Sequence, residues 1–299
     1  MPNLNQIHNE IVEASGPHDQ VRHKYLSRLH NLTSRNIIVY YSGWLTSSTR
    51  AASYSISDYD KIGLMSACNG LDCSKGLDLI LHTPGGDLAA TESIVDYLKN
   101  KFEHIRVVVP QLAMSAGTMI ACAADQILMG KQSSLGPIDP QIGGMPAHGV
   151  IEEFEKAFNA AKVDPATIPI WQLIIGKYPP AIMGQCQKAI AWSERMAGEW
   201  LKDRMFKNDP HQAENVKKVL DELGSHKASL NHARHYSAEQ CKKLGLDIYQ
   251  IEDNQKLQDA ILSVHHATMG TITSGVKGDV SKIIENHQGT ALISTIASG

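Results

Sequence analysis

Strand-like runs alternate with helix-like segments through the first half of the chain, and this alternation constrains the fold more than any other feature. Short apolar runs occur at "IIVYY" (37–41), "LDLILH" (77–82), "IRVVVP" (105–110) and "QILMG" (126–130). Segments with apolar residues at helical spacing separate them, the clearest being 87–102. Such alternation implies right-handed crossovers between parallel strands. The sequence therefore predicts an α/β fold with a mostly parallel sheet flanked by helices.

The remaining segments give further expectations. Residues 4–34 have helical periodicity, and 56–71 reads as a helix that Ser57 or Asp58 caps. Long helices are expected at 149–162 and 181–206, whereas the four prolines of the intervening segment predict a connector at the positions 163–180. Residues 233–253 read as a helix leading into a last strand.

The tail from about Gly270 is rich in Gly, Ser and Thr, so we expect it to be loosely ordered or packed on a partner. The predicted organisation is then an N-terminal helical extension (1–35), a main domain (36–255) and a C-terminal helix with a flexible tail (256–299). The main domain includes a helical segment around 150–225.

Composition narrows the classes of partner. The formal net charge of −3 gives no electrostatic reason to expect nucleic acid or an anionic membrane surface. Five cysteines without a CxxC spacing argue against a disulfide framework or a zinc ribbon, and favour buried free thiols in a reducing compartment. The N-terminus does not read as a secretory signal, and no run approaches the ~20 apolar residues that span a bilayer. We therefore expect a soluble, cytoplasmic protein.

Two loops follow consecutive predicted strands: "HTPGGD" (82–87) and "AMSAGT" (113–118). Ligands bind where the strands of an open parallel sheet end, and each loop also begins a helix with free N–H groups. Gly86 and Ala116 each offer a backbone N–H to a developing oxyanion, and Ser115 offers a hydroxyl. A serine with two converging amide donors is the minimum set for acyl transfer.

Other interpretations fit each loop taken alone. Ser115 is at a helix start, where serine commonly serves as an N-cap, and Pro-Gly-Gly is a common turn. Phosphate binding is a weak alternative because neither GxxxxGK[ST] nor GxGxxG occurs. The G-x-S-x-G elbow of α/β-hydrolases fails on the spacing of its glycines.

The two loops taken together form a pattern that is specific enough to compare with known families. With "SSLGPIDPQ" (133–141) and "HYSAEQCKKLGLDI" (235–248), the stretch resembles the Clp-protease-like serine peptidases of the crotonase fold. Within them it is most similar to the serine dehydrogenase proteinase group, relatives of the signal peptide peptidase SppA. The resemblance covers about 37–253 and implies a ClpP/crotonase-like fold with repeated ββα-type units.

The resemblance implies a serine peptidase that acts on peptides or proteins without a metal or cofactor. Ser115 occupies the position of the nucleophile, and Gly86 and Ala116 occupy the positions of the oxyanion-hole amides. Members of this fold assemble into homo-oligomers, and Trp192 and Trp200, eight residues apart on one predicted helix, would suit a subunit contact.

The general base is the open element of the predicted site. Clp proteases have a histidine about two dozen residues after the serine, where this chain has Asp139, and their aspartate lies where this chain has His232 to His235. The Ser-His-Asp order is therefore not kept. SppA-like enzymes use a Ser-Lys dyad, and Lys177 lies in a similar setting, with apolar neighbours that would lower its pKa by burial. Lys156, Lys162 and His148 are the alternatives.

We expect His82 and Asp139 to be structural. A catalytically inactive assembly or scaffold protein of the same fold is the alternative function, and it gains if no lysine or histidine reaches Ser115. An acyl-CoA hydratase or hydrolase uses a similar pair of amides, and it would need acidic residues in the pocket and an adenine-binding surface.

Overall fold

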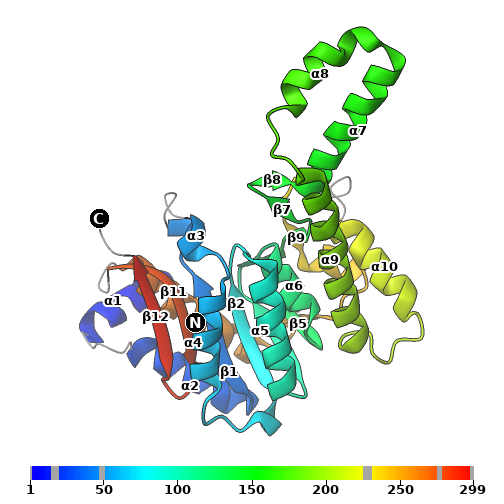
Figure 1. The fold of residues 1–299 in the computed structure, drawn as a ribbon. Coiled ribbons are helices and arrows are strands. Elements are labelled where there is room, and N and C mark those ends of the chain that lie inside the picture. Colours follow the sequence, from blue (N-terminus) through cyan, green and yellow to red (C-terminus); the bar gives the residue numbers. More distant parts are fainter. Residues whose placement is uncertain (1, 15–19, 47–50, 225–230, 275–277, 297–299) are drawn as a thin grey trace.

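A seven-stranded sheet forms the centre of the molecule (Figure 1). The computed structural model describes residues 2–14, 20–46, 51–224, 231–274 and 278–296. In spatial order the strands are β10 (Ile248–Gln250), β5 (Gln126–Met129), β3 (Ile105–Val109), β2 (Leu77–His82), β1 (Asn36–Ser42), β11 (Asp279–Asn286) and β12 (Ala291–Ile296). The first five run parallel, and β11 and β12 each pair antiparallel with the strand before them in that order.

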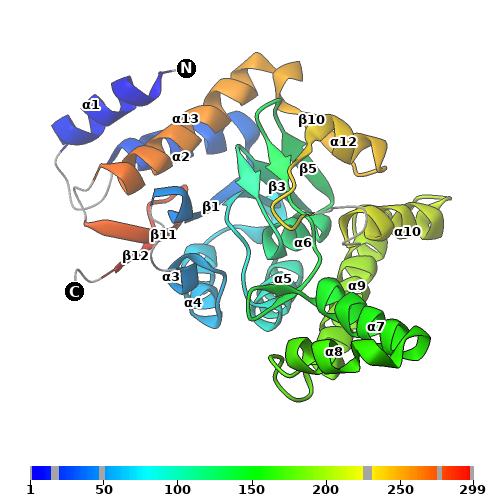
Figure 2. The ribbon, with the colours of Figure 1, turned by 90° about the horizontal axis from the view of Figure 1, so that it is seen from above.

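Helices cover both faces of the sheet, as the sequence predicts (Figure 2). One face packs against α1 (Leu4–Ala14), α2 (Gln20–Thr33) and α13 (Gln255–Thr273), and the other against α4 (Asp58–Cys68), α5 (Leu88–Lys101) and α6 (Ala116–Cys122). Side chains of β1 alternate between the two cores: Ile37 and Val39 face the α13 side, and Ile38 and Tyr40 face the other. Burial on both faces explains why this strand is apolar throughout.

The helix starts follow local sequence. Ser57 is the N-cap of α4 and forms a capping box with Asp60, and Asp87 caps α5 by accepting a hydrogen bond from the Ala90 N–H. Asp87 follows Gly86 directly, so its cap fixes the point where the glycine loop turns into a helix. The expected cap at Ser57 is confirmed.

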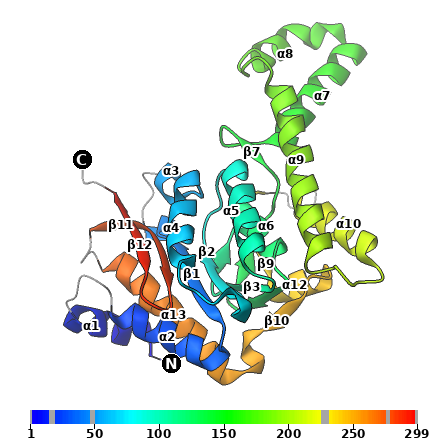
Figure 3. The same ribbon diagram turned by 60° about the horizontal axis from the view of Figure 1, so that its bottom comes forward.

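A helical arm extends from the body of the molecule (Figures 1 and 3). It consists of α7 (Ala147–Val163) and α8 (Ile168–Ile175), and the long helix α9 (Ile182–Asp203) returns to the sheet before α10 (Gln212–Leu223). The predicted connector at 163–180 is wrong in part, because it contains the 3-10 turn η3 (Pro165–Thr167) and α8. Pro165 and Pro169 lie in the first turns of these helices, where a missing N–H costs nothing.

The C-terminal segment completes the sheet. A loosely ordered tail is the wrong expectation for residues 278–296, and β10 is not the last strand, because β11 and β12 follow it. Val280 and Ile283 are buried, so the strand contributes to the core in spite of its polar neighbours. Every position of β11 from Val280 to Asn286 is buried, so the packing of its β-branched residues outweighs the Gly, Ser and Thr content of the segment. Residues 275–277 and 297–299 of the expected tail lie outside the described residues.

Smaller elements complete the fold. They are α3 (Ala51–Tyr54), the 3-10 turns η1 (Trp44–Thr46), η2 (Cys73–Lys75) and η4 (Ile251–Asp253), β4 (Leu112–Ala113), β6 (Ser134–Leu135), β7 (Gln141–Ile142), β8 (Met145–Pro146), β9 (Tyr236–Ser237) and α12 (Ala238–Lys243). Strands β4, β6 and β9 form a small second sheet, and β7 pairs with β8. No helix of the described ranges has both the length and the apolar character needed to cross a bilayer.

Trp192 and Trp200 do not form an outward-facing pair. Trp200 is buried in the core beside α5 and α6, and Trp192 is partly buried against the same core. The two residues anchor α9 to the body of the same chain, so the expected subunit contact does not involve them as an exposed pair. The repeated ββα units remain a prediction.

Candidate active site

The two predicted loops meet at the carboxyl ends of β2 and β3. Thr83 pairs with Ala113 in a parallel bridge, in which the Thr83 N–H donates to the Leu112 carbonyl at 3.2 Å and the Met114 N–H to the Thr83 carbonyl at 3.0 Å. Gly85 has a φ of +96°, and a Cβ added to it would lie 2.7 Å from the Ser115 Cβ. Glycine is therefore required there both by the backbone conformation and by the close approach of the serine.

Ser115 has a strained backbone and an uncommitted hydroxyl. Its φ of +53° and ψ of −119° are uncommon for a residue with a side chain and cost about 1–3 kcal/mol. Although it is the N-cap residue of α6, its side chain makes no capping hydrogen bond. The alternative that Ser115 only caps a helix therefore finds no support in the hydrogen bonding, and strain of this kind is typical of functional positions.

The backbone N–H groups of Gly86 and Ala116 are available to a ligand. Ala116 is the first residue of α6, so its N–H has no carbonyl partner within the helix. Among the described residues, neither N–H donates to a backbone acceptor. The N-terminal end of α6 also carries partial positive charge, which favours a negative oxygen beside Ser115.

Ser115 opens onto a cavity of about 220 Å³. Its lining comprises Ser55, Pro84, Gly85, Gly86, Leu88, Ser115, Ile138, Pro140, Gln141, Ala189 and His232. Most of these groups are apolar or backbone atoms, and no acidic side chain of the described residues lines the cavity. The nucleophile, one predicted oxyanion amide and one imidazole therefore share one small space.

His232 and Asp139 form a hydrogen-bonded pair that the sequence reasoning missed. The His232 Nδ1 lies 2.8 Å from the Asp139 Oδ1; the aspartate is fully buried, whereas the histidine side chain is 23% exposed. With Nδ1 as the donor, the ring has its lone pair on Nε2. One signal in the sequence could have found the pair. Asp139 lies where Clp proteases have the histidine of their triad, and His232 lies where they have the aspartate, so both residue types are present in exchanged order.

The loop of Asp139 is fixed by its neighbours. The Ile138 N–H donates to the Leu223 carbonyl at 2.8 Å, and the Ser193 hydroxyl donates to the Ile138 carbonyl at 3.0 Å. The end of α10 and the middle of α9 therefore hold this loop, so the aspartate has a defined position. The structural role expected for Asp139 is extended by its contact with His232.

The lysines singled out as general bases do not line this cavity. Lys177 lies after α8, and Lys156 and Lys162 lie on α7, so all three belong to the arm (Figure 3). Lys177 is exposed, so the expected burial among apolar neighbours is wrong. The reason is that the helices around it form a hairpin that carries the segment away from the sheet.

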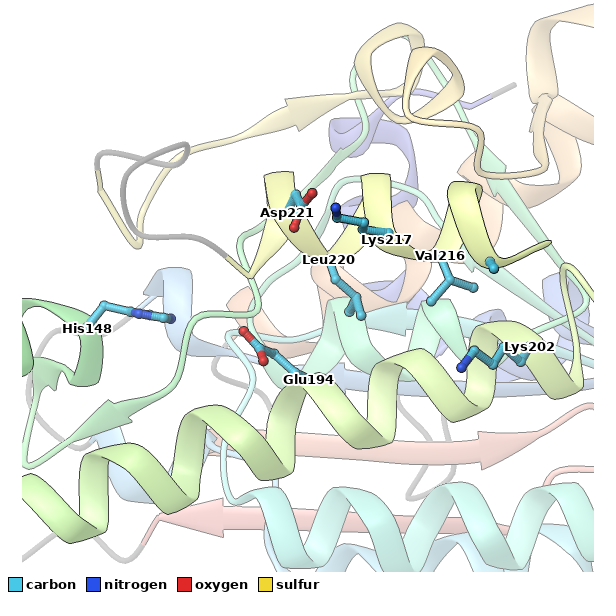
Figure 4. Close-up of a pocket in the computed structure, with 8 residues that line it drawn as sticks. His148, Glu194, Lys202, Val216, Lys217, Leu220 and Asp221 are labelled. Atoms are coloured by element: carbon cyan, nitrogen blue, oxygen red, sulfur yellow. The ribbon is translucent and has the colours of Figure 1, made fainter. Parts of the chain in front are cut away.

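His148 lies at a different and larger cavity of about 430 Å³ between the start of α7, α9 and α10. Glu194, Lys202, Lys217 and Asp221 contribute its charged side chains (Figure 4). The structure therefore does not bring His148 into the cavity of Ser115. Most of these charged groups are exposed, as is usual for a groove between two surface helices.

His82 faces away from the cavity into the opposite core. It is fully buried and packs on Trp44, with ring centroids 4.3 Å apart, and on Tyr41 and His265. Burial lowers the pKa of His82 to about 3, and the nearby His265 contributes to the same shift. The imidazole is therefore neutral and structural, as expected.

Cysteine chemistry is not favoured at this site. All five cysteines are free, as predicted, and Cys122 of α6 is fully buried. Burial raises the pKa of Cys122 to about 12, so its thiol is not a nucleophile at neutral pH. In the part of the chain that the structure describes, no three His, Cys, Asp or Glu side chains gather in a way that could hold a metal ion.

Comparison with known proteins gives one family. Residues 54–262 match the family model described as "ClpP-like SDH-type serine proteinase". Two uncharacterized proteins of Methanocaldococcus jannaschii are similar: MJ0137 is 34% identical over 63% of this chain and 59% of its own length, and MJ1495 is 33% identical over 58% and 51%. The chain thus spans between half and three fifths of the length of these curated relatives.

Proposed function

The chain belongs to the ClpP-like SDH-type serine proteinase family, and from that premise we propose that it hydrolyses peptide bonds through an acyl-enzyme on Ser115. The observation that carries this proposal is the cavity that Ser115, Gly86 and His232 share. The strained backbone of Ser115 and its uncommitted hydroxyl support its role as the nucleophile.

In the first half-reaction, the His232 Nε2 accepts the proton of the Ser115 hydroxyl as its Oγ attacks the peptide carbonyl. The N–H groups of Gly86 and Ala116 donate to the oxyanion of the tetrahedral intermediate. The protonated imidazole then gives its proton to the departing amine. In the second half-reaction, His232 takes a proton from the water that attacks the acyl-enzyme, and returns it to the Ser115 Oγ as the carboxylate product leaves.

Asp139 has a positioning role in this scheme. Its buried carboxylate accepts from Nδ1, which keeps the ring in the tautomer with a lone pair on Nε2 and stabilises the imidazolium that forms. This assignment replaces the Ser-Lys dyad with Lys177. The exchanged order of histidine and aspartate along the chain does not matter, because the triad depends on geometry rather than on sequence order.

The inactive-scaffold alternative loses its main argument once an imidazole lines the serine cavity. The acyl-CoA hydratase or hydrolase alternative is not favoured either, because no acidic side chain among the described residues lines that cavity. Homo-oligomerisation is part of the proposal, and exposed apolar side chains on the arm, Phe158, Val163, Ile170 and Leu173, support it. A cytoplasmic location is supported by five unpaired thiols.

Labelling with a fluorophosphonate probe tests the proposed function. We expect one label per chain in the wild type and none in Ser115→Ala. His232→Ala should slow labelling by roughly 10²–10⁴-fold, because a positioned general base typically contributes about that much. His235→Ala and Lys177→Ala, which change exposed side chains near His232 and on the arm, should label at the wild-type rate.

Two results would contradict this scheme. Labelling that survives in Ser115→Ala would exclude the nucleophile. Normal labelling of His232→Ala together with loss in Lys177→Ala would return the base to the lysine dyad. Peptide mapping of the labelled wild type should locate the phosphonyl group on the peptide that contains Ser115.

A further inference from the structure

A buried lysine of strand β11 lies behind the proposed oxyanion hole. Lys282 of β11 is only 6% exposed, and its Nζ donates to the Ser55 carbonyl at 2.6 Å and to both Asp60 carboxylate oxygens at 2.8 Å. An ammonium group has three N–H donors, and these contacts use all of them. Lys282 is therefore a charged anchor rather than a proton acceptor.

Asp60, the partner of Lys282, also accepts hydrogen bonds from two neighbouring residues. Its Oδ2 accepts from the Tyr40 hydroxyl at 2.9 Å and from the Ser57 backbone N–H at 2.8 Å. Asp60 is 1% exposed, so its charge is compensated by these donors and by Lys282. The ion pair thus holds both ends of the three-residue segment 55–57: the Ser55 carbonyl directly and the Ser57 N–H through Asp60.

Segment 55–57 in turn holds the glycine loop. The Ile56 N–H donates to the Gly85 carbonyl at 2.8 Å, and the Asp87 N–H donates to the Ile56 carbonyl at 3.0 Å, so Gly86 lies between two backbone bonds to Ile56. The contact is close: a Cβ on Gly86 would lie 2.2 Å from the Ile56 nitrogen. Any shift of Ile56 is therefore transmitted to the N–H of Gly86.

We propose that Lys282, with Asp60, is a positioning residue for the oxyanion-hole N–H of Gly86. The inference rests on the proposed function, since it gives this N–H a task in acyl transfer. It also gives β11 a role at the site, because its lysine sets the position of the loop that faces Ser115. Oxyanion donors act only when they are held at the position where charge develops, so a loosened loop should lower the rate of the chemical step and leave binding unchanged.

A second buried ion pair on the same strand provides a matched control. Glu285 of β11 accepts from the Arg22 Nε at 2.6 Å, and these side chains are 4% and 1% exposed. This pair faces the opposite core beside α2 and α13. In both ion pairs, removal of one partner should destabilise the protein, because the other charge is left buried and unpaired. Only the Lys282 pair should also affect the chemical step.

The experiment measures the inactivation rate constant and the half-saturating concentration for a fluorophosphonate probe, normalised to titrated active sites. The variants are wild type, Lys282→Met, Lys282→Arg, Asp60→Asn and Arg22→Met. We expect the inactivation rate constants of Lys282→Met and Asp60→Asn to fall about 10- to 100-fold. This decrease is at most comparable to the one that follows the removal of one oxyanion donor. The half-saturating concentration should stay within about twofold, because neither Lys282 nor Asp60 lines the cavity.

Lys282→Arg should recover part of the rate, since it keeps the charge but not the compact three-way contact. Arg22→Met should lower the denaturation midpoint and keep the wild-type rate constant. If Lys282→Met does not fold, the isosteric Asp60→Asn decides the question, and an unchanged rate constant there overturns the inference.

The two proposals fail in distinguishable ways. A wild type that does not label at Ser115 contradicts the proposed function. A wild type that labels normally, together with Lys282 and Asp60 variants whose rate constants match that of Arg22→Met, contradicts only the positioning role. A rate loss of equal size in Arg22→Met would mean that general destabilisation is the cause, and would also overturn the inference.

Discussion

Small residues decide the active-site geometry at the scale of single residues. Gly85 needs its positive φ and leaves room for Ser115, and Gly86 leaves room for the backbone of Ile56. Gly117 allows α6 to approach β2, because a Cβ there would lie 2.5 Å from the Thr83 Cγ2. The strain at Ser115 is maintained by this surrounding contact, since nothing in its own side chain favours a positive φ.

Gly86→Ala tests the oxyanion hole. The added Cβ would overlap the backbone of Ile56, so the loop must move. We expect the rate of fluorophosphonate labelling to fall by roughly 100-fold or more, and the free energy of unfolding to fall by about 1–3 kcal/mol. Gly184→Ala on α9 is the control: its Cβ meets no neighbour, so labelling should not change and stability should rise by about 0.5–1 kcal/mol. Equal labelling rates for the two variants would contradict the role of Gly86.

At the scale of secondary-structure elements, two segments differ from what their local sequence predicts. The segment 163–180 contributes a helix to an arm, and the C-terminal segment contributes two strands to the sheet. In both cases a composition typical of loops conceals a regular element: prolines at helix starts in the first, and polar residues between buried β-branched ones in the second. Each element also bears on the site, since the arm carries Lys177 away and β11 brings Lys282 close.

Ile283→Ala tests whether β11 belongs to the core. Ile283 is fully buried, so we expect a loss of about 2–5 kcal/mol in the free energy of unfolding by urea. Ile170→Ala on the arm is the matched control, because this isoleucine is 61% exposed and should change stability by no more than about 0.5 kcal/mol. A flexible tail would make both substitutions neutral, and that outcome would contradict the structure of this segment.

Buried neutral histidines affect the stability of the whole molecule. Desolvation lowers the pKa of His82 and of His265 to about 3, and the Tyr41 hydroxyl forms a 3.0 Å hydrogen bond with the His265 Nδ1. Both histidines have an ordinary pKa of 6.5 in the unfolded chain. Between these pKa values the unfolded chain binds more protons than the folded one, so acid favours unfolding. Their contribution to stability is present above pH 6.5 and is lost as the pH falls from 6.5 toward 3.

Urea denaturation between pH 7.5 and pH 5 checks this expectation. The free energy of unfolding should decrease below pH 6.5, with each buried histidine adding a slope that approaches about 1.4 kcal/mol per pH unit. His265→Gln should reduce the slope by about the share of one histidine, and His211→Gln, at an exposed position, should leave it unchanged. A stability that does not depend on pH over this range would mean that the two histidines are not buried as neutral rings.

The sequence by itself determined the features that depend on short-range signals. Alternating strand and helix patterns specify the parallel sheet and the two glycine- and serine-containing loops at its carboxyl edge, because each strand, loop and helix start is contiguous in the chain. The order of residues alone therefore suffices to propose Ser115, Gly86 and Ala116 as candidates. The cap at Ser57 follows in the same way from a few neighbouring positions.

Only the tertiary structure decided which distant groups join the proposed site. His232 and Asp139 are 93 residues apart, and Lys282 and Asp60 are 222 residues apart. Such pairs have no local signature, since a histidine, an aspartate or a lysine in a loop looks the same whether it is solvated or paired. Their partners depend on how α9 and α10 return from the arm and on where β11 joins the sheet. The loop setting and apolar neighbours of Lys177 favoured it in the sequence, whereas the packing of those helices brings His232 into the cavity that Ser115 lines.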